Sequence, residues 1–311
     1  MPHGIIETRP LGDTGERVSC IGLGGSHIGS PKVTDQQAVR LIQQAVDGGI
    51  TFLDNSWDYH EGRSERLMGK ALKDGYRSRA FVMTKFDGRS KTSAAKQIDE
   101  SLKRFRIDHF DLLQFHEVIR FEDVDSFFAK GGAAEALSAA QKAGKTRFIG
   151  FTGHKDPQIH LYMLEAAQER GYAFDTVQMP VNILDSHFRS FTNLVIPVAR
   201  RRKIAVLGMK SLGSGDILES GIVSAEECLR YALSQPVSVV ITGIDSQKVL
   251  KQALEIVRDP KPLTKDEISE LKSRTASIAE HGEYERFKTS NEYDATAKNL
   301  EWLGKEFATK S

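Results

Sequence analysis

The sequence predicts a single (β/α)8 TIM barrel, an α/β fold in which eight parallel strands alternate with helices. Two observations carry this prediction. Eight short apolar runs rich in Val, Ile and Phe recur along the chain, and stretches of helical periodicity separate them. No linker rich in Pro, Gly or Ser divides the 311 residues. Single α/β barrels reach this length, so we treat residues 1–311 as one domain with a barrel core of about 18–260.

The strands are expected at 20–25, 50–55, 80–85, 110–116, 147–153, 175–181, 204–210 and 238–244. These runs are apolar on both faces, which is typical of parallel strands covered by helices. Between the strands, apolar residues recur every three or four positions, and glycine closes several of these segments as it does at helix ends. The clearest of these helices are expected over 38–49, 64–75, 94–105 and 133–145.

A Rossmann-type doubly wound sheet is the alternative fold. The glycine-rich stretch GLGGSHIG (22–29) does not match GxGxxG with a helix opening directly on it. No acidic residue follows the next strand in the ribose-binding role. The barrel is therefore favoured.

Two segments lie outside the barrel pattern. TRPLGDTGERVSC (8–20) predicts an N-terminal hairpin turning at 13–15, which would plug one end of the barrel. PLTKDEISELKSRTASIAEHG (262–282) predicts an extra surface helix. The C-terminal helix and tail thus occupy 263–311, and we expect the polar tail after 282 to lie over the barrel.

Composition narrows the function classes. Lys and Arg number 43 against 42 Asp and Glu, a net charge of +1, which argues against nucleic acid or an anionic membrane as partner. We expect a small-molecule partner. No apolar stretch approaches the roughly 18 residues of a membrane span, and the start lacks the pattern of a secretory signal, so we expect a cytoplasmic protein.

Cys20 and Cys228 stand far apart and outside any CxxC pattern, and the nine histidines form no HExxH pair. We therefore expect no disulfide and no metal site. Both cysteines are expected to be small core residues.

Four polar residues fall at or just after the carboxyl ends of three successive strands, where barrel active sites lie. Asp54 ends the second expected strand, Tyr59 follows in the loop, Lys85 ends the third strand and His116 ends the fourth. Any one of these has an ordinary explanation as a solvated strand-end residue or a packing tyrosine. Their occurrence together predicts a catalytic group.

The four residue types suit proton transfer to a carbonyl oxygen. A tyrosine with a pKa near 10 is a poor acid at neutral pH unless a cation stabilises its phenolate. Lys85 can supply that charge, and Asp54 can keep Lys85 protonated in a partly dry pocket. His116 can donate a hydrogen bond to the carbonyl oxygen and orient it.

With these residues in place, the sequence resembles the aldo-keto reductase superfamily. The resemblance rests on GITFLDNSWDYHEGRSERLMGKAL (49–72), VMTKF (82–86), DLLQFHEV (111–118) and KTRFIGFTG (145–153). It implies an NADPH-dependent or, less often, NADH-dependent oxidoreductase that interconverts an aldehyde or ketone and an alcohol by direct hydride transfer, with Tyr59 as general acid or base. A regulatory nicotinamide-binding protein of the potassium-channel β-subunit type is the alternative function.

The resemblance also implies cofactor contacts. Thr152 and His154 replace a Ser-Asn pair that binds the nicotinamide amide, and Met209 or Lys210 replaces a stacking tyrosine. Gly243 and Val249 stand where basic residues are usual, so Lys248 or Lys251 would have to bind a 2′-phosphate; NADP is favoured and NAD is possible. The expected cofactor residues are Gly25, Thr152, His154, Gln178, Met209, Lys210, Leu212, Gly213, Gly215, Lys248 and Gln252.

The substrate is not determined by the sequence. Trp57, Phe86 and Phe121 are candidates for an apolar wall over the carbonyl, which would suit aromatic, terpenoid, steroid-like or sugar-ring substrates. The alternative for the phenylalanines of the long segment 117–132 is that they pack a short helix onto the barrel. A closed barrel without a repeated edge is expected to be a monomer or a weak homo-oligomer.

Overall fold

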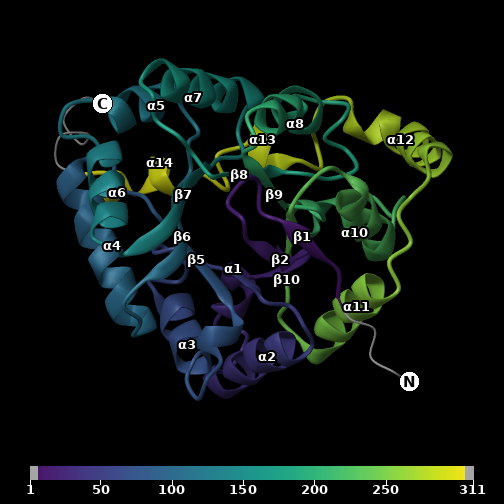
Figure 1. The fold of residues 1–311 in the computed structure, drawn as a ribbon. Helices are drawn as coiled ribbons and strands as arrows, with labels where there is room; N and C mark the ends of the chain where they lie inside the picture. Colours follow the sequence, from purple (N-terminus) through teal and green to yellow (C-terminus); the bar gives the residue numbers. More distant parts are fainter. Residues whose placement is uncertain (1–5, 305–311) are drawn as a thin grey trace.

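The computed structural model describes residues 6–304 and shows a closed barrel of eight parallel strands in the order β10-β3-β4-β5-β6-β7-β8-β9, ringed by helices (Figure 1). Each expected strand overlaps an observed one, which confirms the predicted fold class. The strands are β3 (Ile21–Gly24), β4 (Phe52–Asp54), β5 (Phe81–Phe86), β6 (Phe110–Phe115), β7 (Thr146–Thr152), β8 (Thr176–Pro180), β9 (Ala205–Met209) and β10 (Val239–Gly243).

One long helix follows each strand and covers the outside of the barrel. In α2, for example, a Thr34–Gln37 capping box satisfies the first turn, and the side facing the barrel carries Ala38, Leu41 and Ala45. No helix among residues 6–304 combines the length and apolarity needed to cross a membrane. The ring is formed by α2 (Asp35–Asp47), α3 (Arg63–Ala71), α4 (Lys91–Phe105), α6 (Ala133–Lys142), α7 (Pro157–Glu169), α8 (Phe191–Arg201), α10 (Ala225–Ser234) and α11 (Gln247–Arg258).

Shorter helices lie in the loops. They are α1 (Gly25–Ile28), η1 (Arg77–Arg79), α5 (Phe121–Phe128), η2 (Gly213–Gly215) and α9 (Asp216–Glu219). The loop after β6 that carries α5 is the long connection expected from the sequence.

Alternation along the strands separates an interior core from an outer one. On β5, Phe81 and Met83 point into the barrel, whereas Val82 and Phe86 pack outward against the helices. The same alternation turns Lys85 inward. The interior is thus apolar toward the amino ends of the strands and polar at their carboxyl ends.

The N-terminal hairpin closes the amino end of the barrel, as predicted. β1 (Thr8–Pro10) pairs antiparallel with β2 (Arg17–Ser19), and Leu11 and Val18 join the interior core. Gly12 has a φ of +57°, and a Cβ there would lie 2.7 Å from the carbonyl oxygen of Lys203. Glycine at position 12 therefore allows the turn to pack directly against the backbone just before β9.

The C-terminal segment crosses the opposite, carboxyl face. After α12 (Lys265–Ala279) come α13 (Arg286–Thr289), α14 (Ala295–Lys298) and η3 (Leu300–Trp302), drawn in yellow behind the barrel in Figure 1. The backbone N–H of Arg89, just beyond β5, donates to the carbonyl of Leu303 at 2.9 Å. The tail therefore lies over the strand ends, as expected.

Both cysteines are buried and free, in agreement with the expected core role. Burial raises the pKa of the Cys20 thiol to about 11 and that of Cys228 to about 12. Neither thiol is therefore activated as a nucleophile.

Candidate active site

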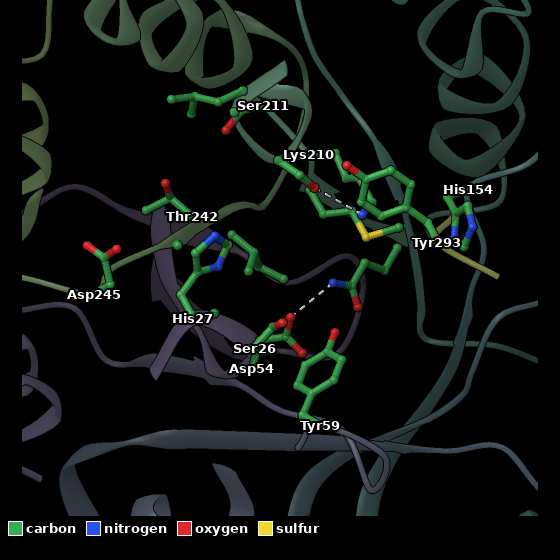
Figure 2. Close-up of a pocket in the computed structure, with 18 of the residues that line it drawn as sticks. Ser26, His27, Asp54, Tyr59, His154, Lys210, Ser211, Thr242, Asp245 and Tyr293 are labelled. Carbon is green, nitrogen blue, oxygen red and sulfur yellow. Dashed lines mark hydrogen bonds between the residues drawn. The ribbon is translucent and has the colours of Figure 1, made fainter. Parts of the chain in front are cut away.

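A cavity of about 600 Å³ lies at the carboxyl ends of the strands. Asp54, Tyr59, Lys85 and His116 all line it. Figure 2 shows Asp54 and Tyr59 at its centre, with Asp245 on one side and His154 and Tyr293 on the other. The structure therefore brings the four predicted catalytic residues together at one place.

Lys85 lies at the floor of this cavity and is 1% exposed. Its Nζ donates to Asp54 Oδ1 at 2.5 Å, to the carbonyl of Asn55 at 2.7 Å and to the Tyr59 hydroxyl at 3.3 Å. Gln178 Nε2 donates to the other oxygen of Asp54 at 3.1 Å, the dashed line beside Asp54 in Figure 2. Because a buried ammonium is stable only when paired, Asp54 keeps Lys85 charged beside the phenol.

Tyr59 follows β4 in a tight loop. Its backbone N–H donates to the carbonyl of Ser56 at 3.3 Å, and Gly62, with a φ of +75°, turns the chain into α3. Burial first, and then the carboxylates of Asp54, Asp58 and Glu117, raise the pKa of Tyr59 well above its ordinary value. The hydroxyl thus holds its proton at neutral pH, as a proton donor must.

His116 belongs to a buried cluster with two acidic residues. Its Nδ1 lies 2.9 Å from Asp87 Oδ1, 3.1 Å from Ser56 Oγ and 3.5 Å from Asp58 Oδ1. Burial raises the pKa of Asp87 to about 7 and that of Asp58 to about 6, and it lowers the pKa of His116. The imidazole is therefore neutral at pH 7, with its Nδ1 within hydrogen-bond distance of the Asp87 carboxyl group.

The sequence pattern did not predict this cluster. Ligand atoms of Asp58, Asp87 and His116 lie within 4.8 Å of one another, a spacing that also suits a metal ion. Fully buried Arg89 donates to the carbonyls of Asp87, His116 and Glu117 at 2.7–3.0 Å, so a cation already braces the same loops. We therefore interpret the carboxyl groups as partners of His116.

The cavity lining includes most of the expected cofactor residues, namely Thr152, His154, Gln178, Met209, Lys210, Leu212, Gly215 and Gln252. Gly25, Gly213 and Lys248 lie outside this lining. At Gly25 a Cβ would lie 2.8 Å from the Asp54 carbonyl and from Ser64 Oγ, and at Gly213 one would lie 2.8 Å from Ile217 Cγ1. Both glycines thus allow close packing, and Lys248 points to solvent from α11.

Lys210 is a cation without a carboxylate partner. Its Nζ lies 3.4 Å from Ser214 Oγ and 4.3 Å from the centre of the Tyr293 ring, and within residues 6–304 it forms no ion pair. Burial lowers its pKa to about 8, so it remains charged at pH 7. Lys210, Gly213, Ser214 and Gly215 all have positive φ, and the backbone N–H groups of Gly213 and Gly215 donate to the carbonyls of Lys210 and Leu212 at 2.9 Å, so the loop folds into tight turns.

The expected apolar wall of Trp57, Phe86 and Phe121 is wrong. Phe86 alternates with inward-pointing Lys85 and so packs outward, 5.8 Å from the ring of Phe115. Trp57 packs on Trp302 and donates to Glu100 at 2.8 Å. Phe121 lies on α5, half exposed, against Tyr162. The packing alternative holds for this segment, where Phe127 is fully buried in the outer core.

Polar side chains line that part of the cavity instead. Glu117 follows His116 with a φ of +48° and accepts hydrogen bonds from the backbone N–H groups of Ala295 and Thr296 at 3.2 and 2.8 Å. The Nε2 atom of His154 lies 3.2 Å from Asp294 Oδ1, within hydrogen-bond distance. Glu117, His154 and Tyr293 therefore form a polar rim that joins the β6 and β7 loops to the C-terminal tail.

Comparisons with known proteins agree with this geometry. A family model described as the aldo/keto reductase family matches residues 20–226. L-Galactose dehydrogenase of Arabidopsis thaliana is 33% identical, over 70% of this chain and 68% of that protein. An aldo-keto reductase of Bacillus subtilis is 29% identical, over 68% of this chain and 63% of that protein.

Solved structures show the same fold. The holo form of an aldo-keto reductase from Bacillus halodurans superposes with a TM-score of 0.73 at 22% identity, covering 90% of this chain and 99% of that one.

Proposed function

The chain belongs to the aldo/keto reductase family, and from this premise we propose that it interconverts a small carbonyl compound and its alcohol with a nicotinamide cofactor, using Tyr59 as general acid or base. The observation that carries the proposal is the contact of Lys85 with both the Asp54 carboxylate and the Tyr59 hydroxyl at the floor of one cavity. This is the arrangement that proton transfer to a carbonyl oxygen needs.

The residues present fit a dinucleotide. Lys210 offers a positive charge that forms no ion pair within residues 6–304, and the loop that begins with it lines the same cavity, so this part of the cavity suits a pyrophosphate. The Oε1 atom of Gln178 is buried and has no hydrogen-bond partner among residues 6–304, so it can accept from the nicotinamide amide. When bound, the cofactor supplies or accepts the hydride.

The protein residues move and hold the proton. In reduction, Tyr59 gives its hydroxyl proton to the oxygen that gains the electron pair, and Lys85 stabilises the phenolate that remains. Asp54 keeps Lys85 protonated, and Gln178 holds the second oxygen of Asp54. His116 faces Tyr59 edge-on at 6.0 Å between ring centres, where it can orient the substrate oxygen.

The polar rim favours hydroxylated substrates. Glu117, His154 and Tyr293 offer hydrogen-bonding groups beside the reaction centre, and the expected aromatic wall is elsewhere. A sugar-like hydroxyaldehyde or its cyclic hemiacetal suits such a lining better than a steroid or terpenoid. The name of the Arabidopsis relative, a dehydrogenase of L-galactose, supports this class.

A substrate panel tests the proposal. The absorbance of the reduced nicotinamide is followed with aldoses on one side and apolar aldehydes such as benzaldehyde on the other. We expect kcat/KM to be higher for the hydroxylated compounds, by about tenfold or more, because their hydroxyl groups pair with buried polar atoms of the rim. Faster turnover of apolar aldehydes would contradict the substrate class, and no turnover of any carbonyl would contradict the activity.

We further propose that Asp87 fixes the tautomer of His116. While Asp87 is protonated it donates to Nδ1, which leaves the N–H on Nε2, free to donate to the substrate oxygen. An ionised Asp87 would instead accept from Nδ1–H and remove that donor. The charged or titratable groups that also act on His116 are Asp58, Glu117, Lys85 and Arg89.

The consequence is a specific pH dependence. Because the pKa of Asp87 is about 7, we expect kcat for reduction to fall as the pH rises through about 7. In Asp87→Asn the amide donates to Nδ1 at every pH, so this decline should disappear. The measurement is kcat against pH for both proteins. A wild-type profile that is level across pH 7, or an unchanged decline in the variant, would refute the assignment.

A further inference from the structure

Within residues 6–304, the part of the cavity lining that β10 and α11 contribute includes one carboxylate and no lysine or arginine. It lies between β10, α10 and α11, and Figure 2 shows Asp245 there, on the side away from His154 and Tyr293. Among residues 6–304, Asp245 is the charged residue lining this end, beside Thr242, Val249 and Gln252. Its carboxylate is exposed and has no ion-pair partner in the same range. Asp245 thus places a negative charge at this end of the cavity.

The nearby lysines of α11 do not bring a positive charge into this end of the cavity. Val249 and Gln252 face the cavity, so Lys248 points to solvent. Lys251 is 77% exposed and lies 3.7 Å from Glu255 on the same helix. The expectation that Lys248 or Lys251 would bind a 2′-phosphate is therefore not supported.

The position of Gly243 excludes a side chain altogether. A Cβ on Gly243 would lie 2.4 Å from Nδ1 of His27, so the ring of His27 fills the space that a lysine would need. Burial lowers the pKa of His27, and that ring is neutral at pH 7. His27 therefore does not replace the missing cation.

The amino terminus of α11 would attract an anion, but the protein's own side chains already cap it. Ser246 Oγ accepts from the backbone N–H of Val249 at 3.3 Å, and Asp245 directly precedes this cap. A carboxylate at a helix start is favourable, and it repels a second anion placed beside it. A ribose hydroxyl, in contrast, can donate a hydrogen bond to that carboxylate.

We infer that Asp245 makes this protein select NAD(H) over NADP(H), by accepting from the 2′-hydroxyl of the adenosine ribose and repelling a 2′-phosphate. The inference rests on the proposed function, since it requires the dinucleotide to run from Tyr59 past the 210–215 loop to the α10–α11 end. It reverses the NADP preference expected from the sequence. Asp245 is thus a specificity-determining residue.

Calorimetric titration with ADP-ribose and with its 2′-phosphate tests the inference without turnover. The wild-type protein should bind ADP-ribose at least about tenfold more tightly. Asp245→Asn should reduce that ratio by about tenfold, mainly through tighter binding of the 2′-phosphate. The matched control, Glu255→Gln, removes an exposed acid from the same helix outside the cavity and should leave the ratio unchanged.

Four outcomes would overturn the inference. Equal or tighter binding of the 2′-phosphate by the wild type, or an unchanged ratio in Asp245→Asn, would show that Asp245 does not discriminate. If NADH, NADPH and both ADP-ribose compounds all fail to bind, the proposed function itself fails and the inference fails with it. Binding of NADH and NADPH with equal affinity would be consistent with the proposed function and would refute only the selectivity for NAD(H).

Discussion

Tyr59→Phe is expected to lower kcat by about 10²–10⁴-fold and to leave cofactor affinity nearly unchanged. The phenylalanine ring keeps the shape of the loop between β4 and α3, and only the proton and its hydrogen bond with Lys85 are lost. Since that proton is needed in the transition state and not for binding, turnover and affinity should separate. The measurements are kcat by nicotinamide absorbance and Kd by titration with the reduced cofactor.

Tyr162→Phe is the matched control. The Tyr162 hydroxyl also makes a hydrogen bond with a charged side chain, in this case by donating to Asp125, but it does so on the exposed surface of α7. It should retain wild-type turnover. If Tyr59→Phe reduced carbonyls at the wild-type rate, or lost cofactor affinity as strongly as turnover, the role of Tyr59 as general acid would be wrong.

Lys288→Met is expected to destabilise the fold by about 3–5 kcal/mol. The Lys288 ammonium is fully buried between Asp185 at 2.9 Å and Glu285 at 3.0 Å, and it also donates to the carbonyl of Phe188 at 2.7 Å. Methionine fills a similar volume but leaves two buried carboxyl groups without their cation. Because Lys288 lies on α13, its loss should also loosen the tail over the cavity.

Urea unfolding followed by circular dichroism measures this effect. The control Lys261→Met breaks an exposed pair with Asp259 and should cost less than about 1 kcal/mol. Equal unfolding midpoints for Lys288→Met and the wild type would show that the buried cluster does not hold the tail in place.

The barrel and the placement of the proposed catalytic residues were predictable because both are encoded locally. Each strand is a short apolar run, and Asp54, Lys85 and His116 end three successive strands, so parallel register alone brings them to one face. Tyr59 follows within five residues of Asp54. No long-range contact has to be known for any of these placements.

The alternation of side chains along β5 also predicts the directions of Phe86 and Asp87. If Lys85 points inward, its neighbour Phe86 must point outward, and Asp87 must turn back toward the interior. This rule excludes Phe86 from the cavity and places Asp87 beside His116, as the structure shows.

The tail contacts could not be predicted from the sequence. Tyr293 reaches the cavity, and Asp294 reaches His154, through long-range contacts of the tail, which include Lys288 with the loop after β8 and the backbone of Ala295 with Glu117. No periodicity in the polar tail encodes that path. The charge at the end of the cavity between α10 and α11 was likewise not predictable. It depends on which side of α11 faces the cavity and on the His27 ring, which fills the space beside Gly243.

The N-terminal hairpin that closes the amino end of the barrel has a kinetic consequence. With that end filled by Leu11 and Val18, a cofactor and a substrate must both pass through the carboxyl face. Under the proposed function the nicotinamide lies beside Tyr59, and Glu117 and Tyr293 line the same cavity where the substrate would bind, so a bound substrate would block the exit of the dinucleotide. We therefore expect a compulsory order of addition and release, with the product departing while the spent cofactor is still bound.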